Sequence, residues 1–294
     1  MEWKTDWGLR GRMAFTMFLL FALYVVFVGA LVAFLDVGNL TILLMLGGFS
    51  IAQYFFSDKL ALRSMGAREV SAEEYPDLHR RIERLSQQAD LPKPTVAVAD
   101  TQVPNAFATG RNKKNATVAV TTGLLRALDD DELDGVLAHE LAHVKNRDVM
   151  VMTIASFLAT IALFILRWGW LFGGGGRNRQ GGGAGIFVAI IASLVVWVVS
   201  FLLIRALSRY REFAADRGAA VITGKPSALA SALATIDGRM DRVPERDLRE
   251  QSEMNAFFIV PISKGTIARL FRTHPRTEKR IDRLRALERE LETA

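Results

Sequence analysis

Four long stretches of this chain contain no acidic, basic or histidine side chain, and they limit the possible folds more than any other feature. They are 23, 20, 18 and 21 residues long and cover residues 13–35, 37–56, 149–166 and 184–204. A helix needs about 20 predominantly apolar residues to cross the hydrocarbon core of a bilayer. The sequence therefore predicts an integral membrane protein with four transmembrane helices, and it excludes an ordinary soluble globule.

The first uncharged run is interpreted as a membrane anchor. It is longer than the apolar core of a secretory signal, which has about 7–15 residues, and no Ala-x-Ala cleavage site follows it. If all four runs cross the bilayer, eleven flanking basic residues lie on one side and three on the other, namely Arg167, Arg177 and Arg179. Because basic flanks stay in the cytoplasm, we expect a multi-pass plasma-membrane protein whose polar segments are cytoplasmic.

These runs divide the chain into four parts. An N-terminal transmembrane hairpin (1–56) precedes a cytoplasmic segment (57–148). A second hairpin (149–204), whose glycine-rich connection covers residues 167–183, precedes a second cytoplasmic segment (205–294). The stretch 173–183 has the composition of a flexible connector.

The composition excludes several classes of protein and site. The chain has no cysteine, which excludes disulfides, thiolate metal sites and a cysteine nucleophile. Any metal must therefore be held by His, Asp or Glu. The net charge is +6, but the basic residues gather beside the apolar runs, so we expect a lipid bilayer as partner and no nucleic acid.

The polar segments contain both helical and strand patterns. Strands are predicted at 95–99, 107–109 and 116–121 from short alternating runs between turn residues. The acidic residues Asp129, Asp130 and Asp131 suit the N-terminus of a helix that continues to Asn146. Further helices are predicted at 72–89, 123–128, 206–222, 227–239, 264–271 and 276–291.

The string His-Glu-Leu-Ala-His lies inside the predicted helix 129–146. His139 and His143 are four positions apart, so both imidazoles lie on one face, one turn apart, where they can bind a single ion. Glu140 points about 100° away from His139. It can therefore take a proton from a water molecule that the metal activates, without ligating the metal itself.

A hydrolytic metal site needs a third protein ligand, and the residues leave more than one candidate. The remaining histidines are His79 and His274. Glu212 and Asp216 form a carboxylate pair one helical turn apart, directly after the fourth uncharged run. Since the third and fourth runs form a hairpin, His143 and Glu212 emerge on the same side of the membrane.

Together these features resemble the HtpX-type membrane zinc metalloproteases, which are related to the CAAX prenyl proteases. The resemblance covers nearly the whole chain, and it is most specific at 104–110, the helix with His139 and His143, Glu212 with Asp216, 273–275 and Arg280. It implies a mainly α integral membrane protein. Four transmembrane helices would carry a zincin-like α+β metalloprotease domain with a small β-sheet.

The resemblance implies roles for particular residues. His139, His143 and Glu212 match the family's ligands to one zinc ion, and Glu140 matches its general base and proton shuttle. Asp216 matches a carboxylate that orients a ligand imidazole.

Further positions match groups around the reacting bond. His274 and Arg280 match late residues that steady the oxyanion or the framework of the site. Substrate is expected to bind as an added strand along the edge formed by Asn105, Ala106, Phe107, Ala108 and Thr109.

The function predicted from these observations is zinc-dependent endopeptidase activity. Its substrates would be misfolded or damaged membrane proteins or other polypeptides, cleaved at the cytoplasmic face in a stress response, with other membrane quality-control proteins as possible partners. One alternative is a CAAX-type prenyl protease, although those relatives use more transmembrane helices. A non-enzyme alternative is a four-span scaffold or transporter with a vestigial metal site. The uncharged runs contain no ion or proton relay, and Glu140 is present, so this alternative is disfavoured.

Overall fold

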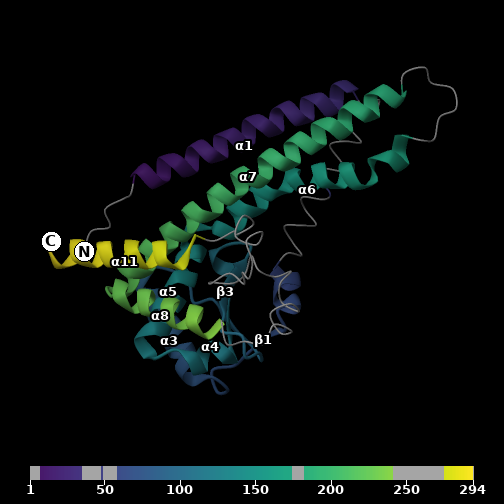
Figure 1. Ribbon diagram of the computed structural model, residues 1–294. Helices are drawn as coiled ribbons and strands as arrows, with labels where there is room; N and C mark the ends of the chain where they lie inside the picture. The colour runs from purple at the N-terminus through teal and green to yellow at the C-terminus, as the bar shows by residue number, and fades with distance from the viewer. Residues whose placement is uncertain (1–6, 35–47, 49–57, 174–181, 241–274, 294) are drawn as a thin grey trace. The chain divides into compact units, whose positions relative to one another are not determined.

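The computed structural model describes residues 7–34, 48, 58–173, 182–240 and 275–293 (Figure 1). The chain divides into two compact units. The polar unit comprises Met1–Thr5, Phe56–Met150 and Ser208–Ala294, and the apolar unit comprises Asp6–Phe55 and Val151–Leu207.

Three long helices of the described residues contribute to the apolar unit: α1 (Trp7–Phe34), α6 (Asp148–Gly173) and α7 (Gly182–Thr223). The first residues of α6 and the last part of α7, from Ser208, belong to the polar unit. Figure 1 shows α1 running beside α7. Large residues of α1, such as Leu20 and Phe27, form one buried cluster with Ala155, Ala162 and Ala189 of the other two helices. Small residues let helices approach closely in an apolar solvent. The opposite surface of α1 exposes large apolar side chains, Phe15, Phe18, Phe21 and Val26 among them, as a lipid-facing helix does.

Two of the described helices are long and apolar enough to cross a membrane, at Trp7–Ala30 and Phe187–Thr223. A third crossing is counted only if Asp130–Asn146 and Asp148–Leu163 are taken together as one bent span. The predicted second crossing, 37–56, and most of the connection 173–183 lie outside the described residues. The described part of the chain is therefore that of a helical membrane protein with at least two candidate spans.

The polar unit contains a four-stranded mixed sheet of order β1-β2-β4-β3. The strands are β1 (Ala67–Glu69), β2 (Thr95–Ala99), β3 (Ala106–Gly110) and β4 (Ala116–Thr121). β2 and β4 are parallel, whereas β1 and β3 pair antiparallel with their neighbours. Every residue of β4 is buried, as expected of a strand covered on both faces. Among the described strands, β3 lies at the end of the sheet and pairs with β4.

The polar unit also contains the helices α3 (Pro76–Gln88), α4 (Thr122–Ala127), α5 (Asp130–Asn146), α8 (Pro226–Met240) and α11 (Thr277–Glu292) (Figure 1). Of these, α4 and α5 pack against the sheet. α5 packs against β3, β4, α3 and α8, and α11 packs against α8. The helix predicted from residue 72 begins later, at Pro76, because proline suits the first turn of a helix. The helix predicted at 264–271 lies outside the described residues.

Both ends of α5 are defined by local structure. At its start, the Glu132 N–H donates to Asp129 Oδ1 at 2.8 Å and the Asp129 N–H donates to Glu132 Oε2 at 3.2 Å, which completes a capping box. At its end, Arg147 adopts the left-handed conformation, with φ 58° and ψ 39°. This residue ends α5 and lets α6 begin immediately at Asp148.

Gly135 lets α5 and α8 approach closely, and its replacement gives a test of the fold. A Cβ atom at Gly135 would lie 2.9 Å from the Leu229 backbone nitrogen. We expect Gly135→Ala to lower the free energy of unfolding by about 1–3 kcal/mol, because overpacking forces backbone shifts. Thermal unfolding in detergent measures this. Gly238→Ala on α8 is the matched control, since a Cβ there meets nothing within 4 Å; equal stability of the two variants would contradict the packing described here.

Candidate metal centre

Three side chains of the polar unit converge on one point. His139 and His143 come from α5 and Glu212 comes from α7. The two Nε2 atoms lie 3.1 Å apart, Glu212 Oε2 lies 3.5 Å from His139 Nε2, and Glu212 Oε1 lies 3.5 Å from His143 Nε2. His139 and Glu212 are buried, whereas His143 is partly exposed. The site is therefore accessible from the side of His143.

The spacing of these atoms fits a metal ion. Ligand atoms that surround an ion tetrahedrally at about 2.0–2.2 Å are roughly 3.3–3.6 Å from one another, close to the three separations observed. Two imidazoles and a carboxylate form a donor set typical of catalytic divalent metals. The residues present therefore fit a metal, with one coordination position left for a small ligand.

The other nitrogen of each imidazole faces a buried carboxylate. His139 Nδ1 lies 3.1 Å from Asp216 Oδ1, and His143 Nδ1 lies 2.6 Å from Asp148 Oδ2. A proton on Nδ1 leaves the Nε2 lone pair available to a metal, which is why ligating histidines have such partners. Both rings are thus held with Nε2 directed at the candidate site.

Arg280 of α11 is fully buried beside these groups. It donates to Asp216 through two bonds, Nη2 to Oδ1 at 2.7 Å and Nε to Oδ2 at 3.0 Å. Its Nη1 lies 3.6 Å from Glu212 Oε2, and its Nη2 lies 3.4 Å from His139 Nε2. The structure therefore brings Asp216 and Arg280 beside the three converging side chains.

The electrostatics of the cluster favour a cation. Burial alone lowers the pKa of His139, but its contacts with the carboxylates of Asp216 and Glu212 outweigh this and raise that pKa to about 9. Burial likewise opposes the charge of Arg280, whereas Asp216, Glu212 and Glu140 raise the pKa of its guanidinium above the ordinary value. An anionic pocket of this kind stabilises a proton or a metal ion on the imidazoles.

Glu140 lies between the two histidines in sequence and is buried on α5. It is close enough to the site for its charge to act on Arg280. The position therefore suits a group that handles protons beside the metal ligands.

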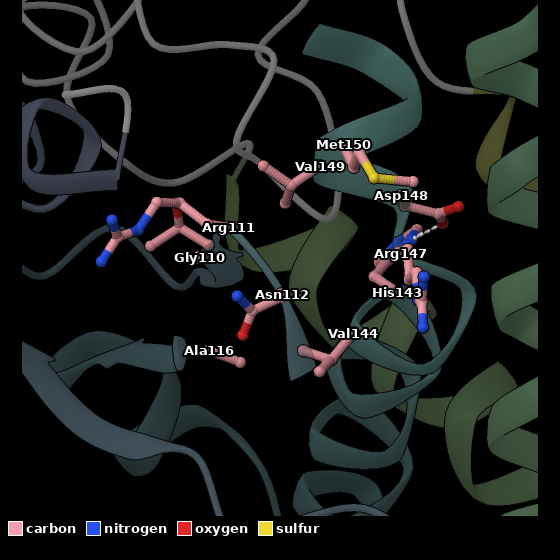
Figure 2. A pocket seen from close by; sticks show the side chains of 11 residues that line it. Gly110, Arg111, Asn112, Ala116, His143, Val144, Arg147, Asp148, Val149 and Met150 are labelled. Carbon is pink, nitrogen blue, oxygen red and sulfur yellow. Dashed lines mark hydrogen bonds and ion pairs between the residues drawn. The ribbon is translucent and has the colours of Figure 1, made fainter. Parts of the chain in front are cut away.

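The predicted substrate edge forms the edge strand of the sheet. Asn105 precedes β3, and Ala106, Phe107, Ala108 and Thr109 belong to it. At the end of this strand, Thr109 and Gly110 line the same pocket as His143 (Figure 2). The rest of that pocket is lined by Arg111, Asn112, Ala116, Val144, Arg147, Asp148, Val149 and Met150.

Among the described residues, His79 lies outside this cluster. The His79 ring bonds to the Val70 carbonyl at 3.0 Å and links α3 to the sheet. His274 lies outside the described residues, so its predicted role stays a prediction.

Sequence reasoning missed Asp148 and its partner Arg211. Arg211 Nε lies 3.2 Å from Asp148 Oδ1, and Figure 2 shows the Asp148 carboxylate beside the His143 ring. In a continuous helix, Asp148 would point about 140° away from His143, since successive residues differ by 100°. The left-handed conformation of Arg147 turns the Asp148 side chain back toward His143. Arginine has no preference for that conformation, so the sequence does not predict the turn.

The buried ion pair gives a second test. Arg280→Met removes the partner of a buried carboxylate, and we expect a loss of about 3–5 kcal/mol in the free energy of unfolding. Denaturant unfolding of the metal-free protein in detergent measures it. Arg285→Met, on the same helix, is the control, since Arg285 is exposed. Equal stability of both variants would show that Arg280 is not the internal counter-ion described here.

Comparisons with known proteins identify the family of this chain. The profile described as Peptidase family M48 matches residues 72–288. "Protease HtpX homolog 2" of Methanosarcina mazei is 57% identical over 99% of this chain and 99% of its own. "Protease HtpX homolog" of Moorella thermoacetica is 54% identical over 98% of this chain and 97% of its own. The crystal structure of S. mikatae Ste24p shares the fold, with a TM-score of 0.53 and 18% identity; the match covers 90% of this chain and 62% of that one.

Proposed function

Because this chain belongs to peptidase family M48, we propose that it is a zinc endopeptidase that cleaves misfolded or damaged membrane proteins at the cytoplasmic face of the plasma membrane. The chain is an HtpX-type membrane metalloprotease, and its reaction is the hydrolysis of peptide bonds. Zinc, the compartment and the substrate class are the parts proposed here.

The observation that carries the proposal is the convergence of His139, His143 and Glu212, whose donor atoms all lie within 4.8 Å of one another. Two imidazoles and a carboxylate, in a chain without cysteine, favour zinc over the hard ions Mg²⁺ and Ca²⁺. Asp216 and Asp148 face the Nδ1 atoms of the two imidazoles, so Nε2 of each ring would be the atom that binds the ion.

A bound zinc ion would supply Lewis-acid activation of water and of the scissile carbonyl. Glu140 accepts the proton of the attacking water and passes it to the leaving amine nitrogen. Arg280 holds Asp216, which in turn fixes the His139 ring. His274 is proposed to stabilise the oxyanion of the reaction or the framework of the site, as the sequence resemblance suggests.

Substrate binding is assigned to β3, the last strand of the described sheet. An extended peptide that pairs with Asn105–Thr109 gains main-chain hydrogen bonds whatever its sequence. Because Thr109 lies at the pocket that His143 also lines, a peptide on this edge leads toward the metal ligands. Sequence-tolerant binding suits an enzyme that clears damaged proteins.

A location close to the bilayer supports membrane proteins as substrates. Glu212 follows the uncharged run 184–204 by eight residues within the single helix α7, a distance of roughly 12 Å. The four-span arrangement and the cytoplasmic side of the site are parts of this proposal. Partners among other quality-control proteins, and a role in stress, would follow from the same substrates.

Cleavage in detergent tests the function. We expect the purified chain to cleave an unfolded membrane protein only when zinc is present, and chelation to stop the reaction reversibly. Activity confined to prenylated C-terminal peptides would instead assign a CAAX-type prenyl protease. Zinc binding without cleavage of either substrate would favour a membrane scaffold with a vestigial site.

A further inference from the structure

Asp148 connects both segments that supply the metal ligands. Its Oδ2 accepts from His143 Nδ1 at 2.6 Å, and its Oδ1 lies 3.2 Å from Arg211 Nε. Asp148 is only 1% exposed. His143 is a ligand on α5, and Arg211 immediately precedes the ligand Glu212 on α7. The Asp148 carboxylate therefore ties the end of α5 to α7 beside the candidate metal.

The backbone at this point has an uncommon conformation. Arg147 is one of two residues other than glycine with positive φ in the described part of the chain. Such a conformation has a free-energy cost for a residue with a Cβ, and it persists where the surrounding structure requires it. Here it ends α5 one residue before Asp148, and this brings the carboxylate back to the His143 ring.

The arrangement repeats the one found at the other imidazole. His139 faces Asp216, which is held by the guanidinium of Arg280. His143 faces Asp148, which is held by the guanidinium of Arg211. Each ligand ring thus has its own buried carboxylate and its own arginine, although the sequence resemblance accounted only for the first set.

We propose that Asp148 and Arg211 are a positioning pair for the metal site. Asp148 fixes the tautomer and orientation of His143, so that Nε2 is available to the ion. Arg211 holds Asp148 in place and thereby keeps His143 close to Glu212. The proposal rests on the proposed function, since it assumes that His143 and Glu212 bind the metal. Its consequence is that Asp148 and Arg211 control metal affinity without touching the metal.

The zinc affinity of the full chain in detergent tests the pair. Asp148→Asn keeps the shape of the side chain, but it removes the charge that His143 requires. We expect its zinc dissociation constant to rise by about 10–100-fold, the usual effect of losing such a partner. Competition with a chromophoric chelator gives this constant without any assay of activity.

Two further variants separate positioning from stability. Arg211→Met should also weaken zinc binding, and Asp148→Asn with Arg211→Met should weaken it no further than Asp148→Asn alone, because the two residues act through one contact. The double variant carries no unpaired buried charge, so it also serves if Asp148→Asn fails to fold. Asp134→Asn is the matched control: it breaks an ion pair of the same helix with Arg81 and Arg84, and its zinc affinity should equal that of the wild type.

The outcomes distinguish this proposal from the proposed function. Weak binding by both Asp148→Asn and the double variant, with a normal control, supports the pair. Wild-type affinity in the double variant overturns it, as does an equal loss in Asp134→Asn. If His143→Ala itself binds zinc as the wild type does, the proposed function fails first, because His143 is then not a ligand.

Discussion

Replacement of Glu140 by Gln is expected to lower kcat for peptide hydrolysis by about 10²–10⁴-fold, the usual contribution of a positioned general acid or base. The amide keeps the size of the side chain but cannot accept the proton of water. Glu140 is not one of the three converging donors, so zinc content should stay at one ion per chain. Turnover and zinc content measured on the same preparation give both values.

Glu83→Gln is the control for this variant, since Glu83 is an exposed residue of α3 paired with Lys93. It should match the wild type in both measurements. Wild-type turnover by Glu140→Gln would remove Glu140 from the proposed mechanism. Loss of zinc from Glu140→Gln would instead assign it to the metal site.

Replacement of Glu212 by Gln is expected to abolish both zinc binding and cleavage. It removes the one anionic donor of the set, and its Oε atoms lie 3.5 Å from both Nε2 atoms. We expect the zinc dissociation constant to rise by more than about 100-fold, which exceeds the 10–100-fold effect of losing a partner outside the ligand set.

Metal analysis after dialysis against a weak chelator measures the effect of this change. Glu278→Gln on α11 is the control, because Glu278 is exposed. If both Glu212→Gln and Glu278→Gln retain one zinc ion per chain, the third ligand is not Glu212, and His274 becomes the next candidate. If only Glu212→Gln loses zinc, the carboxylate of α7 is the ligand.

Local sequence signals predicted much of the polar unit. The strands at 95–99 and 116–121 match β2 and β4, because apolar β-branched residues lie there between turn residues. The helix after Asp129 matches α5, whose capping box has a clear signature. β1 was missed, since its three residues, Ala-Arg-Glu, have no strand pattern and pair only because β2 lies beside them.

The pattern of charged residues did not predict where some helices begin and end. A separate helix was predicted after residue 204, where charges resume, yet α7 continues unbroken from Gly182 to Thr223. The reason is that no proline or glycine interrupts it between 186 and 217. Conversely, the chain turns at Arg147, between two strongly helical segments, where the residues themselves predict no break.

The candidate site was predictable to the extent that it depends on local spacing. His139 and His143 share a helix face whatever the rest of the chain does, so their pairing followed from the sequence. Glu212 is 69 positions after His143, and their proximity could be inferred only from the predicted hairpin, which places both residues on the same side of the membrane. Asp148 and Arg211 could not be found this way, because their contact requires both the left-handed turn and the packing of α7.

The central claim is that one metal ion is bound by His139, His143 and Glu212. Anomalous diffraction at the zinc absorption edge, from crystals of the zinc-loaded protein, tests this most directly. We predict one strong peak about 2.0–2.2 Å from both Nε2 atoms and from a Glu212 carboxylate oxygen. A peak bound by other residues, or none between α5 and α7 in fully loaded crystals, would contradict the account.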